Sequence, residues 1–139
     1  MWLIALDVGD VRVGVALLDT SVGVPLVHGT FERAKGEAEK KVIELCNSRP
    51  IDRIIVGLPL NEDGSENLQC EKVRNFSRRL VKRVAVQLQF IDEYASSEEA
   101  QQRLRDMGER QPELGRIDAL AATILIERYL ESGDRGMLT

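Results

Sequence analysis

The stretch LIALDVGDVRVGVALL, residues 3–18, decides the expected fold. Residues 3–9 form an apolar run interrupted only by Asp7, which is typical of a strand buried on both faces of a sheet. A short turn at residues 10–12 separates this run from a second one at residues 13–18, so we expect the two to pair as a hairpin. The aspartate is unusual there, because a buried carboxylate is costly unless it is paired or bound to a metal ion.

Outward from this hairpin, apolar periodicity predicts a third strand and then alternating helices and strands. Gly23 and Pro25 at the start of the third strand favour an edge position, and Pro50 ends the first helix. Ser96 or Ser97 is expected to cap the third helix. The expected strands are residues 23–31, 53–59 and 85–91, and the expected helices are residues 34–48, 66–83, one after Ser97 and a last one around residues 117–125. This order predicts an α/β fold with a mixed five-stranded sheet and helices on its faces.

Length and composition are those of one small globular domain spanning residues 1–139. The chain is 43% hydrophobic and 30% charged, without a low-complexity tract. Cys46 and Cys70 are isolated from each other, which favours free thiols in a reducing compartment. The apolar N-terminal run is too short for a signal peptide or a membrane span. We therefore expect a cytoplasmic protein that does not act at a membrane.

Carboxylates follow two of the predicted strands and enter the last helix. Asp7 ends the first strand, Asp92 and Glu93 follow the fifth, and Asp118 lies in an apolar helix. Each also has an ordinary explanation. Asp7 would support a turn, Asp92 and Glu93 would lie in a solvated loop, and the charge of Asp118 would be favourable near a helix N-terminus. Because sites in open α/β sheets gather at the carboxyl ends of strands, we expect these acids to converge at one edge.

Oxygen-only ligands select hard cations, so converging carboxylates predict Mg²⁺ or Mn²⁺. The single histidine, His28, makes a zinc site of histidine and cysteine improbable. Two hard ions roughly 3.5–4 Å apart would activate water and stabilise the leaving oxygen in phosphodiester hydrolysis. The sequence therefore favours a metal-dependent nuclease, with two ions as cofactors.

Four blocks of the sequence together resemble the YqgF/RuvX family. Residues 7–16, DVGDVRVGVA, match its D-x-G-x-x-R-x-G-x-A opening, and residues 55–64, IVGLPLNEDG, match its V-G-L-P-x-N-x-D-G block. Residues 92–100, DEYASSEEA, and residues 117–122, IDALAA, resemble its last two blocks. The resemblance implies a ribonuclease H-like fold similar to that of Holliday-junction resolvases. It also implies a nuclease that processes the 5′ end of the small-subunit (16S) ribosomal RNA precursor or resolves branched DNA.

By this resemblance Asp7, Glu93 and Asp118 are the catalytic, metal-binding acids, with Asp92 as the alternative at the second position. The chain departs from the family at Tyr94, where an arginine is expected after the Asp-Glu pair. This departure puts a phosphate contact in doubt.

A second departure lies just before the last acid. A lysine often found there is absent, and Leu114 and Gly115 occupy that region. Arg116 is the nearest basic residue. The expected consequence is weaker substrate affinity rather than loss of the metal site.

Other residues of these blocks have expected roles in turns and in nucleic-acid binding. Gly9 allows a sharp turn, Gly14 leaves room for a close approach, and Gly57 and Pro59 shape the turn after the fourth strand. Arg12 is expected either to bind a phosphate through two hydrogen bonds or to be an ordinary surface arginine. Asn61 orients substrate or forms a turn.

The chain carries a net charge of −4 with a pI near 5.1, which argues against binding nucleic acid through overall positive charge. Its strongest positive feature is the second predicted helix, which is either a solvated face or a surface that binds the phosphate backbone. The basic residues there are Lys72, Arg74, Arg78, Arg79, Lys82 and Arg83, of which Arg74, Arg78 and Arg79 are the candidate contacts.

Two other functions are compatible with parts of the sequence. A non-catalytic module that binds RNA or a transcription partner would keep the acids as structural residues. Sugar kinases and actin-like ATPases also begin with an Asp-x-Gly hairpin, but they need a second such domain, which 139 residues do not hold. The expected partner is a nucleic acid, either an rRNA precursor or branched DNA, and a homodimer is left open.

Overall fold

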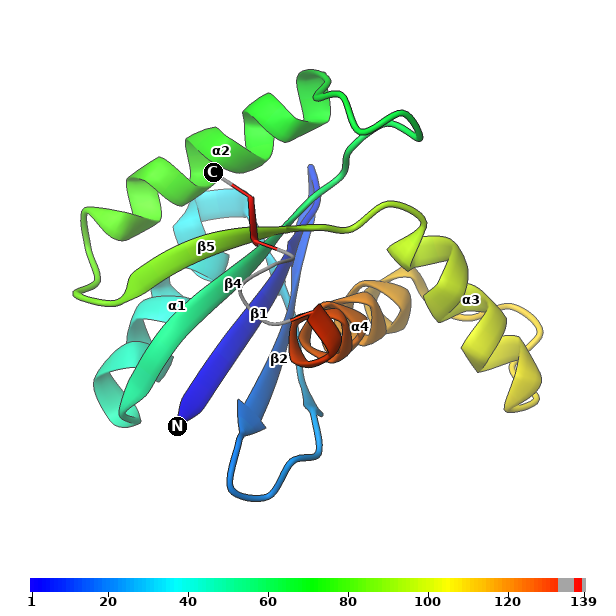
Figure 1. The fold of residues 1–139 in the computed structure, drawn as a ribbon, viewed down its shortest axis with the longest axis horizontal. Coiled ribbons are helices and arrows are strands. Elements are labelled where there is room, and N and C mark those ends of the chain that lie inside the picture. The colour runs from blue at the N-terminus through cyan, green and yellow to red at the C-terminus, as the bar shows by residue number, and fades with distance from the viewer. Residues whose placement is uncertain (133–136, 139) are drawn as a thin grey trace.

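The computed structural model describes residues 1–132 and 137–138. In this part of the chain, one sheet with the strand order β3-β2-β1-β4-β5-β6 lies between two layers of helices (Figure 1). The strands are β1 (Trp2–Val8), β2 (Arg12–Asp19), β3 (Leu26–Glu32), β4 (Ile51–Leu58), β5 (Gln87–Asp92) and β6 (Met137–Leu138). The helices are the 3₁₀ turn η1 (Ala34–Gly36), α1 (Glu37–Ser48), α2 (Leu68–Val81), α3 (Ser96–Asp106) and α4 (Leu114–Ser132). The predicted α/β architecture is confirmed.

The sheet combines a meander with parallel crossovers. β1 pairs antiparallel with β2, and β2 pairs antiparallel with β3. β4 lies parallel to β1 on its other side, and β5 lies parallel to β4. The carboxyl ends of β1, β4 and β5 therefore meet at one edge of the sheet, where sites form in such folds.

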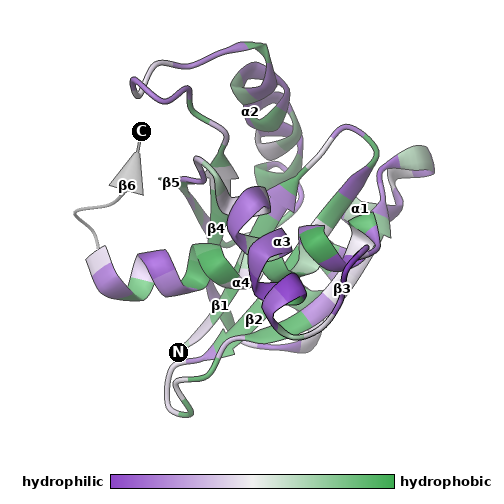
Figure 2. Cartoon of the chain, turned by 90° about the vertical axis from the view of Figure 1, so that its right-hand side faces the viewer, coloured by the Kyte–Doolittle hydropathy of each residue, from purple (hydrophilic) through white to green (hydrophobic). Residues whose placement is uncertain are grey.

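Both faces of the sheet are covered, because alternate residues of the central strands point to opposite sides. On one face Ile4 and Leu6 pack in a cluster that includes Val42 of α1 and Phe76 of α2. On the other face α4 packs on the sheet, and Figure 2 colours much of this helix green for hydrophobic residues, whereas α3 is mostly purple. In the described ranges, no helix has both the length and the apolar character that a membrane span needs.

Three local predictions are wrong. The third strand begins at Leu26 rather than at residue 23, because the loop containing Gly23 and Pro25 precedes it, although β3 does lie at the sheet edge. A two-residue strand, β6, pairs antiparallel with β5 and adds a sixth strand to the predicted five. Neither Ser96 nor Ser97 caps α3: its N-cap residue is Ala95, in a left-handed conformation and without a side-chain hydrogen bond to the helix.

Gly14 allows α4 to approach the sheet closely. It lies on β2 opposite Asp7 of β1. A Cβ atom built on Gly14 would lie 2.1 Å from the backbone oxygen of Asp118. Any side chain at this position would push the start of α4 away, so the predicted close approach at Gly14 is confirmed and the approaching group is a helix backbone.

We predict that Gly14→Ala lowers the free energy of unfolding by about 1–3 kcal/mol, the usual cost of overpacking. Gly115→Ala is the matched control, because its added Cβ would meet only Thr30, at 3.8 Å. Chemical denaturation of both variants checks this. Equal stability of Gly14→Ala and the unchanged protein would show that the helix does not depend on this contact.

Candidate active site

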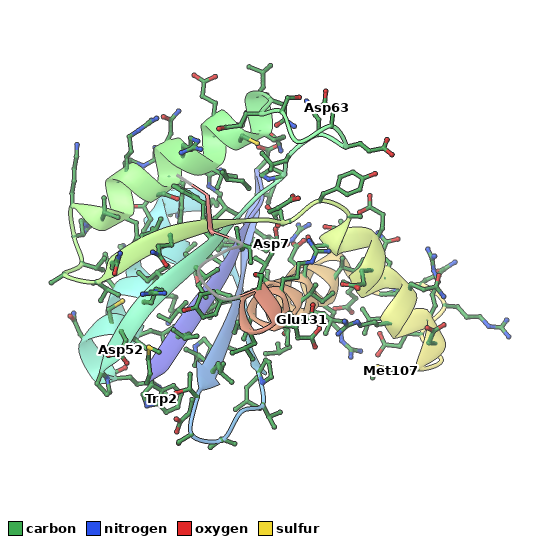
Figure 3. The ribbon with its side chains drawn as sticks, viewed as in Figure 1. Trp2, Asp7, Asp52, Asp63, Met107 and Glu131 are labelled. Carbon is green, nitrogen blue, oxygen red and sulfur yellow. The ribbon has the colours of Figure 1, made fainter. Side chains whose placement is uncertain are left out.

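Two carboxylates lie buried side by side at the carboxyl edge of the sheet. Asp7 is 8% exposed and Glu93 is 6% exposed, and their carboxyl groups lie close enough for each to shift the pKa of the other. Asp7 comes from the end of β1, and Glu93 directly follows β5, where its backbone N–H donates to the carbonyl of Leu58 at 3.0 Å. Figure 3 shows Asp7 near the middle of the molecule, whereas Trp2, at the other end of the same strand, lies at the periphery.

Gly57 of β4 makes room for the Glu93 side chain. A Cβ atom on Gly57 would lie 2.6 Å from the carboxyl carbon of Glu93. On the other side of Asp7, Gly14 admits the backbone of Asp118. Two glycines on the strands that flank β1 therefore clear the space in which the three acids meet.

Asp118 is the third acid, in the first turns of α4. Its Oδ2 atom accepts a hydrogen bond from Nε of Arg12 at 3.1 Å, and its side chain is 24% exposed. Its negative charge raises the pKa of Asp7, and Asp118 lines the same cavity as Asp7 and Glu93. The structure thus brings the three predicted acids to one place.

Burial and mutual repulsion weaken the acidity of these groups. Burial raises the pKa of Asp7 from 3.8 to about 6, and the negative charge of Asp118 adds to this shift. Burial, followed by the charge of Asp7, raises the pKa of Glu93 well above its usual value. The pKa of Asp118 is raised by burial against the opposing effect of Arg12. A bound cation would relieve the cost of ionising all three.

The acids line an open cavity of about 360 Å³. Its walls come from the ends of β1, β4 and β5, the start of α2 and the start of α3. The lining residues are Asp7, Val8, Gly9, Pro59, Leu60, Gln69, Glu93, Tyr94, Ala95, Ser96, Ser97, Glu98 and Asp118.

The chemistry of the donor set fits a hard cation. Asp7 and Glu93 offer buried carboxylate oxygens that make no ion pair in the part of the chain described, and oxygen ligands suit Mg²⁺ and Mn²⁺. Asp118 would be the third ligand, but here it binds Arg12. Accordingly, no ready-made group of three ligating side chains occurs among residues 1–132 and 137–138. A cation shared by all three acids would require the Asp118 side chain to change its partner.

Asp92, the alternative to Glu93, points away from the cavity. It is exposed, and its Oδ1 atom accepts a hydrogen bond from the backbone N–H of Tyr94 at 2.8 Å. The alternation of side chains along β5 separates the two neighbouring acids, one to solvent and one to the interior. The geometry therefore favours Glu93 as the second acid.

The predicted turn residues differ in where they lie: Gly9 and Pro59 border the cavity, whereas Gly57 was wrongly predicted to shape a turn and lies within β4. Gly9 donates its N–H to the carbonyl of Arg12 at 2.8 Å, which closes the turn after β1. The Asn61 backbone bonds to Ser65 and Gly64, and its side chain bonds to Ser65 and Asn67. Asn61 is thus a turn-forming residue that does not line the cavity.

The basic face of α2 is less positive than its sequence indicates. Arg74 forms two hydrogen bonds with Glu66, at 2.7 and 2.8 Å, and also lies over the ring of Phe90. Glu39 pairs with Arg79 and Arg83, and Asp10 pairs with Lys72. Among the described residues, Arg78 and Lys82 form no ion pair, although Arg78 donates a hydrogen bond to Asn75.

Two further residues matter at the site. Ser96, read from the sequence as a helix cap, is 2% exposed, and its hydroxyl donates to Glu93 Oε2 at 3.4 Å. Gln69 at the start of α2 also lines the cavity, and nothing in its sequence context marks it. Arg116, the nearest basic residue to the missing lysine, pairs with Glu109 instead of pointing at the acids.

Comparisons with known proteins find matches that span nearly the whole chain. A family model described as RuvX, Holliday junction resolvase, matches residues 1–132. A relative from Anaeromyxobacter dehalogenans (strain 2CP-C), named "Putative pre-16S rRNA nuclease", is 34% identical over 134 residues, which cover 94% of this chain and 97% of the relative. A relative of the same name from Serratia proteamaculans (strain 568) is 34% identical over 131 residues, covering 93% and 94%.

A solved structure shares the fold at low identity. The structure titled "T. thermophilus RuvC in complex with Holliday junction substrate" superposes with a TM-score of 0.60 and 14% identity, covering 99% of each chain. A structure of the same protein, titled "Thermus thermophilus RuvC structure", has a TM-score of 0.57. At this identity the likeness concerns the fold, which confirms the ribonuclease H-like prediction.

The raised pKa values predict that the metal-free protein loses stability as pH rises. A carboxyl group whose pKa is higher in the folded state stabilises the fold at low pH, and this contribution is lost as pH rises from 3.8 through about 6. For Asp7 the loss is at most about 3 kcal/mol, from about 1.4 kcal/mol per pKa unit. Denaturation in a chelator at several pH values measures it.

Asp7→Asn should flatten this pH dependence, and Asp92→Asn, which changes the exposed neighbouring acid, should leave it in place. The comparison between variants matters because exposed acids such as Asp19 and Asp63 have lowered pKa values and act with the opposite sign. An identical pH dependence in Asp7→Asn and the unchanged protein would contradict the assignment.

Proposed function

Because this chain belongs to the RuvX family, we propose that it is a nuclease that hydrolyses phosphodiester bonds in structured nucleic acid with Mg²⁺ or Mn²⁺. The observation that supports this most strongly is the buried pair Asp7 and Glu93, with Asp118 beside it, at the base of an open cavity. Residues 1–139 act as one nuclease domain in this proposal. In this proposal the activity is located in the cytoplasm.

The three acids have distinct tasks in this proposal. Asp7, Glu93 and Asp118 would hold the cations, most simply two of them. When bound, such ions activate water and stabilise the leaving oxygen. Because burial raises the pKa values of Asp7 and Glu93, cation binding would have to displace a proton from either group that carries one, since the ligating form is the carboxylate. Ser96 helps to orient Glu93 by donating its hydroxyl hydrogen to Oε2.

Arg12 is the residue best placed to meet the substrate phosphate. Its side chain is 29% exposed, and its Nε atom already binds an oxyanion, the carboxylate of Asp118. An arginine can present its remaining donors to a phosphate. Arg12 would thus hold the backbone of the nucleic acid close to the acids, and its move toward the phosphate would release Asp118 for the cation.

The basic face of α2 supplies a secondary contact with the backbone. Its first turn borders the cavity through Gln69, so a strand leaving the cavity can run along this helix. Arg78, without an acidic partner in the described residues, is available to phosphates at once. Arg74 and Arg79 have to exchange Glu66 and Glu39 for phosphate. In this proposal Arg78 therefore contributes more to binding of the nucleic-acid backbone than Arg74 and Arg79 do.

We favour an RNA precursor of the small ribosomal subunit as the substrate. The names of the relatives support this choice, while the family description and the fold neighbour's title refer to a Holliday junction. In this proposal one copy of the chain supplies one active site, formed by Asp7, Glu93 and Asp118. Paired cuts across a four-way junction would therefore need two copies of the chain, whereas one cut in an RNA needs one.

We predict that Asp7→Asn and Glu93→Gln each reduce cleavage at least about 100-fold, because each removes a charged ligand of the metal site. The assay compares labelled precursor RNA, a four-way DNA junction and linear duplex DNA, each with Mg²⁺, Mn²⁺ or chelator. Asp92→Asn is the matched control and should cleave like the unchanged protein. Circular dichroism verifies that each variant is folded.

The outcomes separate the candidate functions. Cleavage of RNA but not of the junction supports the precursor nuclease, and the reverse result supports a resolvase. Equal cleavage by Asp7→Asn and the unchanged protein would contradict the site. Binding of RNA without any cleavage, in all variants, would favour the non-catalytic module.

A further inference from the structure

Tyr94 is an exposed aromatic residue at the mouth of the cavity that holds the acids. It is 46% exposed and directly follows the buried Glu93. Its ring makes no aromatic or cation–π contact, and its hydroxyl forms no hydrogen bond, within the described residues. The other tyrosine, Tyr129, accepts a hydrogen bond from Arg53 and packs against the core. Tyr94 therefore contributes little to the packing of the fold.

The backbone around Tyr94 is held in place. Its N–H donates to Asp92 Oδ1 at 2.8 Å, and the N–H of Ser96 donates to the carbonyl of Glu93 at 3.0 Å. Between them Ala95 adopts a φ of 59°, a left-handed conformation that costs a residue other than glycine about 1–2 kcal/mol. The turn thus holds the Tyr94 ring at the surface, next to the buried carboxyl group of Glu93, at a cost in backbone strain.

The position of the ring next to the acids limits what it can bind. A phosphate that reaches Asp7 and Glu93 brings the attached nucleosides to the rim of the cavity, where Tyr94 lies. A tyrosine ring offers a large, rigid face, and stacking on one base contributes about 1–3 kcal/mol. In a duplex the neighbouring bases cover each base face, so only an unpaired or splayed nucleotide can stack on the side chain.

We propose that Tyr94 stacks on an unpaired nucleobase adjacent to the bond that is cut. This inference rests on the proposed nuclease function and specifies its substrate, a nucleic acid with a flexible, unpaired nucleotide at the cleavage position. Tyr94 is then a specificity-determining residue, and the metal-binding acids read only the phosphate.

The first test is a cleavage assay with matched substrates. An RNA with the normal nucleotide beside the cut is compared with the same RNA carrying an abasic nucleotide there, placed in turn on the 5′ and 3′ sides. Tyr94→Ala should lower kcat/KM for the normal RNA about 5- to 150-fold, the equivalent of about 1–3 kcal/mol. Tyr94→Phe, which keeps the ring, should stay within about twofold, since stacking needs no hydroxyl.

The abasic substrate identifies the partner of the ring. With the abasic nucleotide on the correct side, the unchanged protein should fall to the rate of Tyr94→Ala, and Tyr94→Ala should be insensitive to the missing base. Met107→Ala, an exposed residue at the far end of α3, is the control and should cleave normally (Figure 3). A loss in Tyr94→Phe as large as in Tyr94→Ala would overturn stacking in favour of a hydroxyl contact. Unchanged kcat/KM in Tyr94→Ala would overturn the proposal as well.

A binding measurement separates this proposal from the nuclease function. An RNA with 2-aminopurine beside the cut is titrated with protein in Ca²⁺, so that binding is followed without cleavage. Quenching by the unchanged protein and by Tyr94→Phe, but not by Tyr94→Ala, supports stacking even if no cleavage is found with any metal. Equal quenching in Tyr94→Ala would overturn stacking even if the nuclease activity is established.

Discussion

The contact between the carboxyl groups of Asp7 and Glu93 is the constraint on which the site depends. Two neighbouring acids buried below 10% exposure are costly in a fold that forms no ion pair with either of them in the described part of the chain. The surrounding backbone is arranged around them. Gly14 admits the start of α4, and Gly57 leaves room for the Glu93 side chain.

This arrangement explains how an acidic chain can act on a polyanion. A net charge of −4 and three clustered carboxylates repel phosphate, unless cations neutralise the acids. The protein therefore separates two tasks. In the proposed function, the acids at the base of the cavity would hold the cations, while Arg12 and the partly neutralised face of α2 would meet the backbone of the nucleic acid.

The sequence predicted the element order and the convergence of the acids, because these follow from simple periodicity and from parallel strand topology. Apolar runs on both faces marked β1 and β4, and parallel pairing brings the ends of β1 and β5 to the same edge. The family resemblance already favoured Glu93 over Asp92, but only the structure shows that Glu93 is buried at the cavity while Asp92 is exposed. The cap of α3 was mispredicted because Ser96 bonds to Glu93 instead of to the helix.

Contacts between residues far apart in the chain account for the other differences. The basic run of α2 was easy to see, but its partners Asp10, Glu39 and Glu66 are dispersed over other segments. The ion pair of Arg12 with Asp118 joins residues separated by 106 positions. β6 has only two residues, too few for any alternation to be recognised.

Calorimetric titration of the metal-free protein with Mn²⁺, in two buffers of different ionisation enthalpy, tests the central claim most directly. Burial raises the pKa values of both Asp7 and Glu93, and a cation binds their ionised forms, so binding near pH 6 should release protons to the buffer. Asp7→Asn should bind Mn²⁺ much more weakly. Absence of binding by the unchanged protein, or equal binding and proton release by Asp7→Asn, would contradict a metal site built on this pair.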